Sequence, residues 1–230
     1  MIVGGITGLI IWFFLKVMNL GIKFSVRKTS QGLKYVIIPN NDSNDYSIKL
    51  NEASSGTQNV VPINVIVEYY SKYYDLVSSI NNAIFSYVSK SDNLSDFKAV
   101  KNVGEFSSKN VHLIIEEPEL SLFPSTQREL IDYIVSSITH VPARGYNISL
   151  MMATHSPYII NYLNVLLRRF SKGIESAPSI NASDIAVYRI FDGQIQNLMS
   201  ENIATGETIV NTIDLSEDME EIYNEYINLK

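Results

Sequence analysis

The sequence contains no cysteine and has a modest share of charged residues. With no cysteine in 230 residues, disulfides and thiolate metal sites are excluded, which is consistent with the cytoplasmic location that we expect. The net charge of −6 argues against a protein whose main task is to coat nucleic acid, although a local basic patch is compatible with that value. Hydrophobic residues make up 46% and charged residues 18%, a balance typical of a globular domain with a sizeable core.

A hydrophobic run long enough to span a membrane is also missing. Residues 1–15 (MIVGGITGLIIWFFL) are uncharged, but a transmembrane helix needs about 20 apolar residues. Neither a preceding positive charge nor a small-residue cleavage site indicates a signal peptide. We interpret residues 1–22 as an apolar N-terminal segment with a buried helix over residues 9–20, and we expect no membrane partner. A membrane anchor formed by residues 1–18 is the alternative.

The first third of the remaining chain alternates between strand and turn patterns. Apolar stretches at Ile22–Arg27 and Leu33–Ile38 flank Ser30-Gln31-Gly32, which predicts two strands joined by a turn. Residues 46–50 are predicted to form a third, short strand. A long helix is predicted from about residue 60 to residue 88, in which tyrosines at helical spacing serve as packing residues.

Strands and helices then alternate. A polar loop is expected over residues 89–110, before the first of two short apolar runs, Val111–Ile115 and Ile148–Ala153. Both runs are typical of buried parallel strands. Helices are predicted over residues 125–138 and 156–170, after the first and second run respectively. This order predicts an α/β fold with a parallel sheet flanked by helices.

The C-terminal part has a hairpin signal and an acidic helix. Asp192-Gly193 lies between two strand-like stretches, residues 185–191 and 194–198, and this dipeptide is a strong signal for a tight hairpin turn. Residues 216–228 are predicted to form an acidic helix. We therefore expect a small β-hairpin beside the parallel sheet.

Carboxylates follow the first apolar run. In parallel sheets, ligands bind at the carboxyl ends of the strands, and the first strand ends in Glu116-Glu117-Pro118-Glu119. Adjacent carboxylates at the tip of an apolar strand are costly unless they have a function. A magnesium ion held by Glu116 would explain the first carboxylate, and Glu117 could deprotonate a water for attack on a phosphate. An exposed acidic turn is the alternative interpretation.

Two further segments could contact a phosphate. The second strand ends in Thr154-His155-Ser156-Pro157, so His155 would lie beside the carboxylates if the two strands are neighbours. The small residues of Ser54-Ser55-Gly56-Thr57-Gln58 allow close approach of the backbone to a ligand, and the following helix directs its positive end toward an anion. Taken separately, each segment is also explained as the ordinary start of a helix.

The order of these three segments resembles the ABC-type ATPases, in which a signature loop, a Walker B strand and a switch histidine follow one another. The stretches IIEEPELSLFP (residues 114–124) and ATHSP (residues 153–157) are similar to the RecF-like and OLD-type AAA proteins. Phe123 stands where that group often has histidine. The resemblance covers roughly residues 15–200, and it implies the C-terminal part of an ABC-type P-loop NTPase head, extending here over residues 23–230.

The resemblance also implies a role for each segment. Glu116 would hold Mg²⁺ through its water shell, Glu117 would be the general base, and His155 would contact the γ-phosphate of ATP. Residues Ser54, Ser55, Gly56, Thr57 and Gln58 would close on ATP bound by a second subunit. The active site would then be composite and would form in a dimer, within a protein of the DNA-repair or anti-phage defence type that could also contact DNA.

The phosphate-binding P-loop of these ATPases is missing from the sequence. No G-x-x-x-x-G-K-[S/T] pattern occurs, and the glycine-rich stretch at residues 4–8 lacks the lysine that contacts the β- and γ-phosphates. We therefore expect negligible ATP hydrolysis by the chain alone and an N-terminal ATPase half as its partner. A fragment, a split gene and a degenerate relative all remain open. The alternative function is a non-catalytic interaction module that retains the fold.

Overall fold

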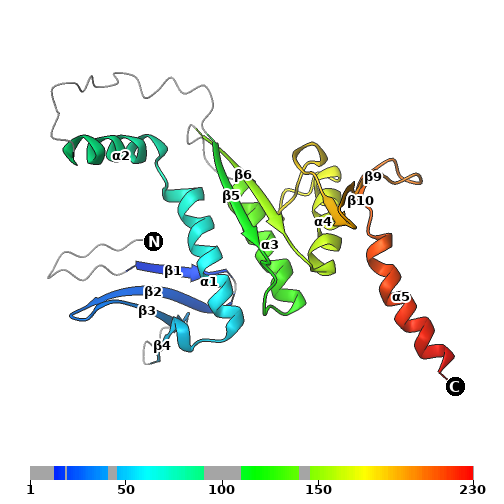
Figure 1. The fold of residues 1–230 in the computed structure, drawn as a ribbon, viewed down its shortest axis with the longest axis horizontal. Coiled ribbons are helices and arrows are strands. Elements are labelled where there is room, and N and C mark those ends of the chain that lie inside the picture. Colours follow the sequence, from blue (N-terminus) through cyan, green and yellow to red (C-terminus); the bar gives the residue numbers. More distant parts are fainter. Residues whose placement is uncertain (1–12, 19, 41–45, 91–109, 140–145, 230) are drawn as a thin grey trace. The chain divides into compact units, whose positions relative to one another are not determined.

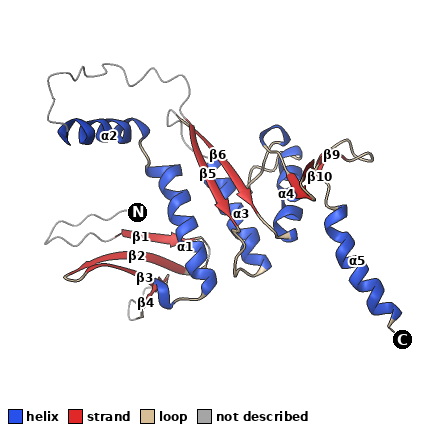
Figure 2. Ribbon diagram, in the orientation of Figure 1, coloured by secondary structure: helices blue, strands red, loops and turns tan. Residues whose placement is uncertain are grey.

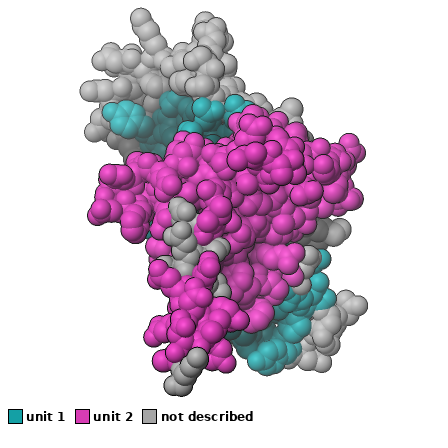
Figure 3. Space-filling view, turned by 90° about the vertical axis from the view of Figure 1, so that its right-hand side faces the viewer, with its two compact units in different colours: residues 1–116, 137–153 teal, residues 117–136, 154–230 magenta. Residues whose placement is uncertain are grey.

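The computed structural model describes residues 13–18, 20–40, 46–90, 110–139 and 146–229. The chain divides into two compact units, coloured separately in Figure 3. Unit 1 comprises residues 1–116 and 137–153, and unit 2 comprises residues 117–136 and 154–230.

The helices and strands are drawn in Figures 1 and 2. In chain order they are β1 (Phe13–Val17), β2 (Ile22–Thr29), β3 (Gly32–Pro39), β4 (Ile48–Lys49), α1 (Ser55–Glu68), α2 (Leu76–Lys90), β5 (Asn110–Glu116), α3 (Pro124–Thr139), β6 (Asn147–Ala153), α4 (Pro157–Ser171), β7 (Tyr188–Phe191), β8 (Gln194–Asn197), β9 (Met199–Glu201), β10 (Thr208–Val210) and α5 (Ile213–Asn228).

Unit 1 begins with a four-stranded antiparallel sheet in the order β1-β2-β3-β4. The predicted turn between β2 and β3 is confirmed: Thr29 Oγ1 accepts a hydrogen bond from the Gln31 N–H and donates one to the Gly32 carbonyl. Gly32 has φ +117°, a value that favours glycine. Helix α1 contacts β1, and the two elements bury Val17, Val60 and Val67 completely.

The predicted N-terminal helix is wrong where the structure can test it. Residues 13–17 form β1, which pairs antiparallel with β2 from Phe13↔Val26 to Val17↔Ile22. The left-handed conformations of Met18 (φ 43°) and Gly21 (φ 67°) belong to the turn between the strands, not to a helix end. A short apolar run does not distinguish strand from helix by itself, and here antiparallel pairing with β2 decides for the strand. Residues 1–12 lie outside the described residues.

The predicted helix over residues 60–88 is two helices. Helix α1 starts earlier, at Ser55, and is followed by a wide π-helical turn at Tyr69–Tyr73 before Tyr74 becomes extended. The Tyr146 hydroxyl lies 2.8 Å from the Tyr70 carbonyl oxygen and 3.0 Å from that of Tyr74. These contacts stabilise carbonyls that the broken helix would otherwise leave without partners. The sequence could not predict the break because the stabilising side chain lies more than 70 residues away.

The two predicted parallel strands are confirmed. Strand β5 pairs in parallel with β6, from Asn110↔Asn147 to Glu116↔Ala153. The prediction that both strands are buried is wrong for one face, on which Ile114 is 69% and Met151 67% exposed. Parallel sheets are normally covered on both faces, and the described part of this sheet has only these two strands.

The core of unit 2 lies between α3 and α4. The side chains that these helices bury almost completely are Leu130, Ile131, Ile134, Ile159 and Leu166. Asp132 joins the two helices, because its carboxylate accepts hydrogen bonds from the Tyr162 hydroxyl (2.7 Å) and from Arg169 Nη1 (3.1 Å). Burial of the phenol, together with its hydrogen bond to Asp132, raises the pKa of Tyr162.

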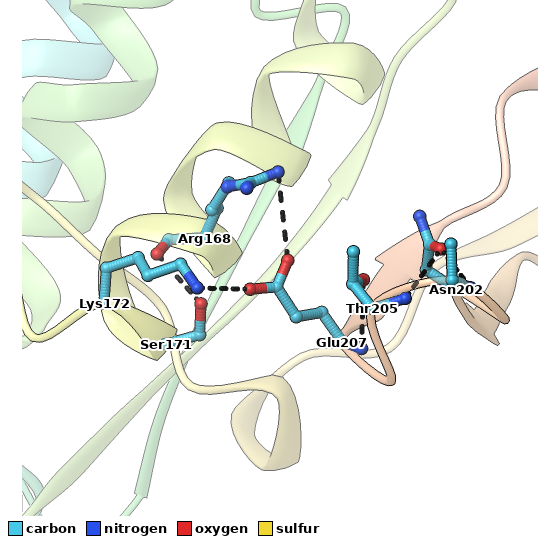
Figure 4. Close-up of polar contacts among 7 residues, drawn as sticks. Arg168, Ser171, Lys172, Asn202, Thr205 and Glu207 are labelled. Carbon is cyan, nitrogen blue, oxygen red and sulfur yellow. Dashed lines mark hydrogen bonds and ion pairs between the residues drawn. The ribbon is translucent and has the colours of Figure 1, made fainter.

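The C-terminal strands are joined to α4. The Asn164 side-chain amide donates to the Val210 carbonyl (3.0 Å) and accepts from the Val210 N–H (2.7 Å), which holds β10 on the helix. In Figure 4, Glu207 faces Lys172 and Arg168, at distances of 3.0 Å and 3.9 Å. The hydrogen bond and the positive charge of Lys172 lower the pKa of Glu207.

The remaining C-terminal predictions also hold. The hairpin β7–β8 turns at Asp192 (φ 47°) and Gly193 (φ 70°), and α5 contains the predicted acidic helix. Among the helices that the structure describes, none combines the length and the apolar composition needed to cross a bilayer.

The carboxylate of Glu207 predicts an acid-sensitive contact. Because folding lowers its pKa below the ordinary 4.5, its contribution to stability is present above that value and is lost as the pH falls through the lower, folded-state pKa. We expect Glu207→Gln to lower the thermal unfolding midpoint at pH 7 and to have a smaller effect at a pH well below 4.5. Glu175→Gln, at an exposed carboxylate of the same unit, serves as the control. Equal effects of both variants at both pH values would contradict the prediction.

Candidate functional site

The chain turns sharply where it leaves β5. Glu117 (φ 45°) and Ser121 (φ 59°) both have left-handed backbone conformations, which residues other than glycine rarely adopt. The Leu120 N–H donates to the Glu117 carbonyl (3.0 Å), and the Leu122 N–H donates to the Glu119 carbonyl (2.9 Å). These bonds form a compact turn over residues 117–122 directly after the strand.

A second compact loop follows β6. The Ser156 N–H donates to Thr154 Oγ1 (3.0 Å), and Ser156 Oγ accepts from the Ile159 N–H (3.3 Å). Ser156 is therefore the N-cap of α4, and Pro157 occupies the first helical turn, where proline is tolerated. His155 lies between these contacts, and its side chain is 86% exposed.

The turn and the loop bring Glu117 and His155 together. Glu117 Oε1 lies 3.7 Å from His155 Nε2, and the Glu117 side chain is 52% exposed. This distance exceeds that of a hydrogen bond, and the contact is an ion pair only when the imidazole is protonated. Of the two carboxylates predicted to lie beside the histidine, Glu117 is observed there, with both side chains accessible to a ligand.

Two residues with no predicted role join the turn to the loop. Glu119 Oε1 accepts a 2.6 Å hydrogen bond from the His155 N–H. Gln127 is 7% exposed. Its Oε1 accepts from Ser156 Oγ (2.5 Å) and its Nε2 donates to the Leu122 carbonyl (3.0 Å). The turn and the loop are therefore connected by two separate side chains.

Sequence reasoning could have found one of these residues but not the other. Glu119 belongs to the acidic run after the strand, and its carboxylate could have been considered together with the two before it. Gln127 lies in the first turn of α3, and its contact with Ser156 spans 29 residues. No local pattern indicates that contact, because it depends on how α3 and α4 pack.

The predicted metal ligand belongs to unit 1. Glu116 is the last residue of β5, opposite Ala153 in the register, and it is exposed. Within the described ranges, neither Glu116 nor Glu117 forms an ion pair with lysine or arginine. The part of the chain that the structure describes contains no group of three or more histidine, aspartate or glutamate side chains arranged to hold a metal ion.

The predicted signature segment, Ser54–Gln58, starts a helix in unit 1. Ser54 is the N-cap of α1 and accepts from the Thr57 N–H (3.3 Å), so Ser55, Gly56, Thr57 and Gln58 form the first helical turn. Gln58 Nε2 donates to the Ala53 carbonyl (2.7 Å). Ser54 and Ser55 are exposed, and the first turn carries no acidic residue. A bound anion would therefore not be repelled by a negatively charged side chain of this turn.

The chemistry available in unit 2 is that of a carboxylate and an imidazole side by side. An exposed carboxylate can accept a proton from water, and an imidazole can donate a hydrogen bond to an anionic oxygen. Both groups lie on short loops at the carboxyl ends of parallel strands, the usual location of ligands in α/β folds.

Part of the chain is similar to a known protein family. Residues 12–160 match the protein family described as AAA ATPase domain. The match extends over more than half of the 230 residues and includes both strands, the turn and the loop. A search of curated proteins found no match.

The double role of Ser156 predicts an unusually costly substitution. Ser156→Ala removes the cap of α4 and leaves the buried Gln127 Oε1 without its donor, so we expect a loss of about 2 kcal/mol in unfolding free energy. Ser54→Ala, which removes an exposed cap, should cost about 0.5–1 kcal/mol. Urea unfolding followed by circular dichroism measures both, and equal losses would contradict the role assigned to Gln127.

Proposed function

Because the chain belongs to the AAA ATPase domain family, we propose that Glu117 and His155 form the hydrolytic part of an ATP site. Glu117 is the general base that deprotonates the attacking water, and His155 contacts the γ-phosphate. The observation that carries this proposal is the 3.7 Å separation of Glu117 Oε1 and His155 Nε2, with both side chains exposed.

The surroundings of Glu117 support its role as a base. A base must be ionised and must not be neutralised by a permanent cationic partner. The ion-pair partner of Glu117 among the described residues is His155, which is not a permanent cation as lysine and arginine are. The carboxylate can therefore turn to a water placed beside a bound phosphate.

The carboxylates at the end of β5 and directly after it suit magnesium. Mg²⁺ is commonly bound by one or two carboxylates together with substrate phosphates and water, so a cluster of three acidic side chains is not required. We assign Glu116 as the residue that would hold the ion through its water shell. When bound, the ion neutralises charge on the phosphate oxygens.

The 230-residue sequence contains no P-loop, so an ATP site of this kind needs a P-loop from another segment of protein. The pair β5–β6 has an exposed apolar face at Ile114 and Met151, and an isolated two-stranded parallel sheet has too little buried surface to be stable. We propose that an N-terminal ATPase half supplies the P-loop together with strands that extend this sheet.

The finer assignment follows the RecF-like and OLD-type ATPases. In that arrangement Ser54–Gln58 would close on ATP held by a second subunit, so the working form is a dimer with composite sites. DNA repair or anti-phage defence is the matching biological role, with DNA contacted by the completed assembly. The exposed apolar face of β5–β6 is equally compatible with the second candidate, an interaction module without turnover.

The first test is ATP hydrolysis by residues 1–230, alone and with an N-terminal half encoded nearby. We expect negligible phosphate release by the chain alone and turnover on addition of the half. Glu117→Gln should then abolish turnover but preserve nucleotide binding, because the amide is isosteric but cannot accept the proton. Glu129→Gln, an exposed glutamate on α3, is the matched control. Normal turnover of Glu117→Gln would reject the base, and absence of both binding and turnover would favour the interaction module.

A second test concerns the signature segment. Ser55→Arg places a long side chain where the phosphate would approach the first turn of α1, so ATP-driven dimerisation of the completed assembly should be lost. Asn82→Arg makes the same change of charge at an exposed position on α2 and should dimerise normally. Molar mass from light scattering with and without ATP distinguishes the two. Unchanged dimerisation of Ser55→Arg would remove the assignment of Ser54–Gln58.

A further inference from the structure

Glu119 and Gln127 hold together the two short segments that carry Glu117 and His155. Glu119 belongs to the turn after β5 and accepts from the backbone N–H of His155 at 2.6 Å. Gln127 reaches both segments from α3, with 3.0 Å to the Leu122 carbonyl and 2.5 Å to Ser156 Oγ. All of these residues belong to unit 2, so the contacts lie within one compact body.

The backbone of Glu117 needs such support. Its φ of 45° is rare for a residue with a Cβ, and conformations of this kind persist only where the surrounding contacts impose them. The Pro118 ring fixes the next φ angle, and Glu119 then fastens the turn to the loop after β6. The direction of the Glu117 side chain therefore depends on the bond made two residues later.

The chemical nature of the two side chains argues against simple space-filling. Gln127 is 7% exposed, and Glu119 Oε2 is buried without a hydrogen-bond partner among the described residues. Burying an amide or a carboxylate costs free energy unless its hydrogen bonds offset that cost. Apolar side chains would fill the same volume without this cost, so the polar contacts themselves are what the positions supply.

We propose that Glu119 and Gln127 are positioning residues that hold Glu117 and His155 at their working separation. The role in catalysis rests on the proposed ATPase function, whereas the geometric role can be measured without nucleotide. Neither side chain is assigned to touch the substrate. Each acts through the backbone or the N-cap of the segment that it holds.

The first measurement is hydrogen exchange at the His155 amide in the full chain. Glu119→Ala removes the acceptor, so exchange should be about tenfold faster, as expected for the loss of one hydrogen bond. Glu119→Gln keeps an acceptor oxygen at the same reach, so exchange should stay within about threefold of the parent protein, since a neutral acceptor is weaker than a charged one. Glu129→Ala is the control for loss of an exposed carboxylate. Equal exchange in Glu119→Ala and the parent would overturn the role of Glu119.

The second measurement tests the coupling between the proposed catalytic groups. The chain has three histidines, so the His155 imidazole signals can be resolved by NMR and assigned with His155→Gln. Glu117→Gln should shift the His155 signals in the parent protein. In the Glu119→Ala or Gln127→Leu background, Glu117→Gln should shift the His155 signals much less, because the side chains at positions 117 and 155 are no longer held together. His112, in unit 1, is the internal control. An undiminished response in both backgrounds would overturn the proposal, even if one variant is less stable.

Turnover of the completed assembly separates the two proposals. If both are correct, Glu119→Ala should lower kcat by about tenfold or more with little change in KM for ATP, and Glu119→Gln should restore most of the rate. If NMR coupling is lost as expected but the parent assembly never hydrolyses ATP, the geometric role stands and the proposed function fails. Turnover that Glu119→Ala leaves unchanged would overturn the catalytic part of the inference.

Discussion

The parallel pairing of β5 with β6 is the constraint on which the candidate site depends. The register ends with Glu116 opposite Ala153, so the chain leaves both strands at the same edge of the sheet. Glu117 follows one strand directly, and His155 follows the other after one residue. A slip of the register by one residue would reverse the face of every side chain in the slipped strand. Backbone hydrogen bonds between the strands thus set the points at which the two segments carrying the carboxylate and the imidazole begin.

A layer of buried and partly buried polar contacts in unit 2 converts this arrangement into a defined geometry. Ser156 caps α4 and donates to Gln127, while Asp132 binds Tyr162 and Arg169 in the same pair of helices. Hydrogen bonds depend on the angle and distance between donor and acceptor, whereas Leu130 and Leu166 stay buried when the helices shift slightly. Apolar packing therefore stabilises the α3–α4 pair, and the polar contacts determine its alignment and the positions of the loops beside it.

The exposed face of the β5–β6 sheet gives the proposed requirement for a partner a physical basis. Ile114 and Met151 are about two-thirds exposed, in strands of a type that is normally covered on both sides. The signature-like residues Ser54–Gln58 form a capped helix start without acidic residues, which suits an anion but is also an ordinary helix N-terminus. Both features fit an ATPase part that works only when further protein segments surround it.

Local chemistry made several elements predictable from the sequence. The turns at Gln31-Gly32 and Asp192-Gly193, the cap at Ser156 and the apolar runs of β5 and β6 each depend on residues that are adjacent in the chain. The β1 strand was not predictable in this way, because a short apolar run fits helix and strand equally and pairing with β2 decided between them. The break after α1 likewise depends on Tyr146, a distant side chain.

The candidate site was likewise predictable from the sequence only in part. The sequence by itself determined which chemical groups follow the two strands, because carboxylates and a histidine after apolar runs can be identified without coordinates. Only the tertiary structure decided that Glu117 and His155 lie 3.7 Å apart and that Glu119 and Gln127 connect their loops. These contacts join residues 29–38 positions apart, and such contacts form only when strands pair and helices pack, which no local pattern in the chain encodes.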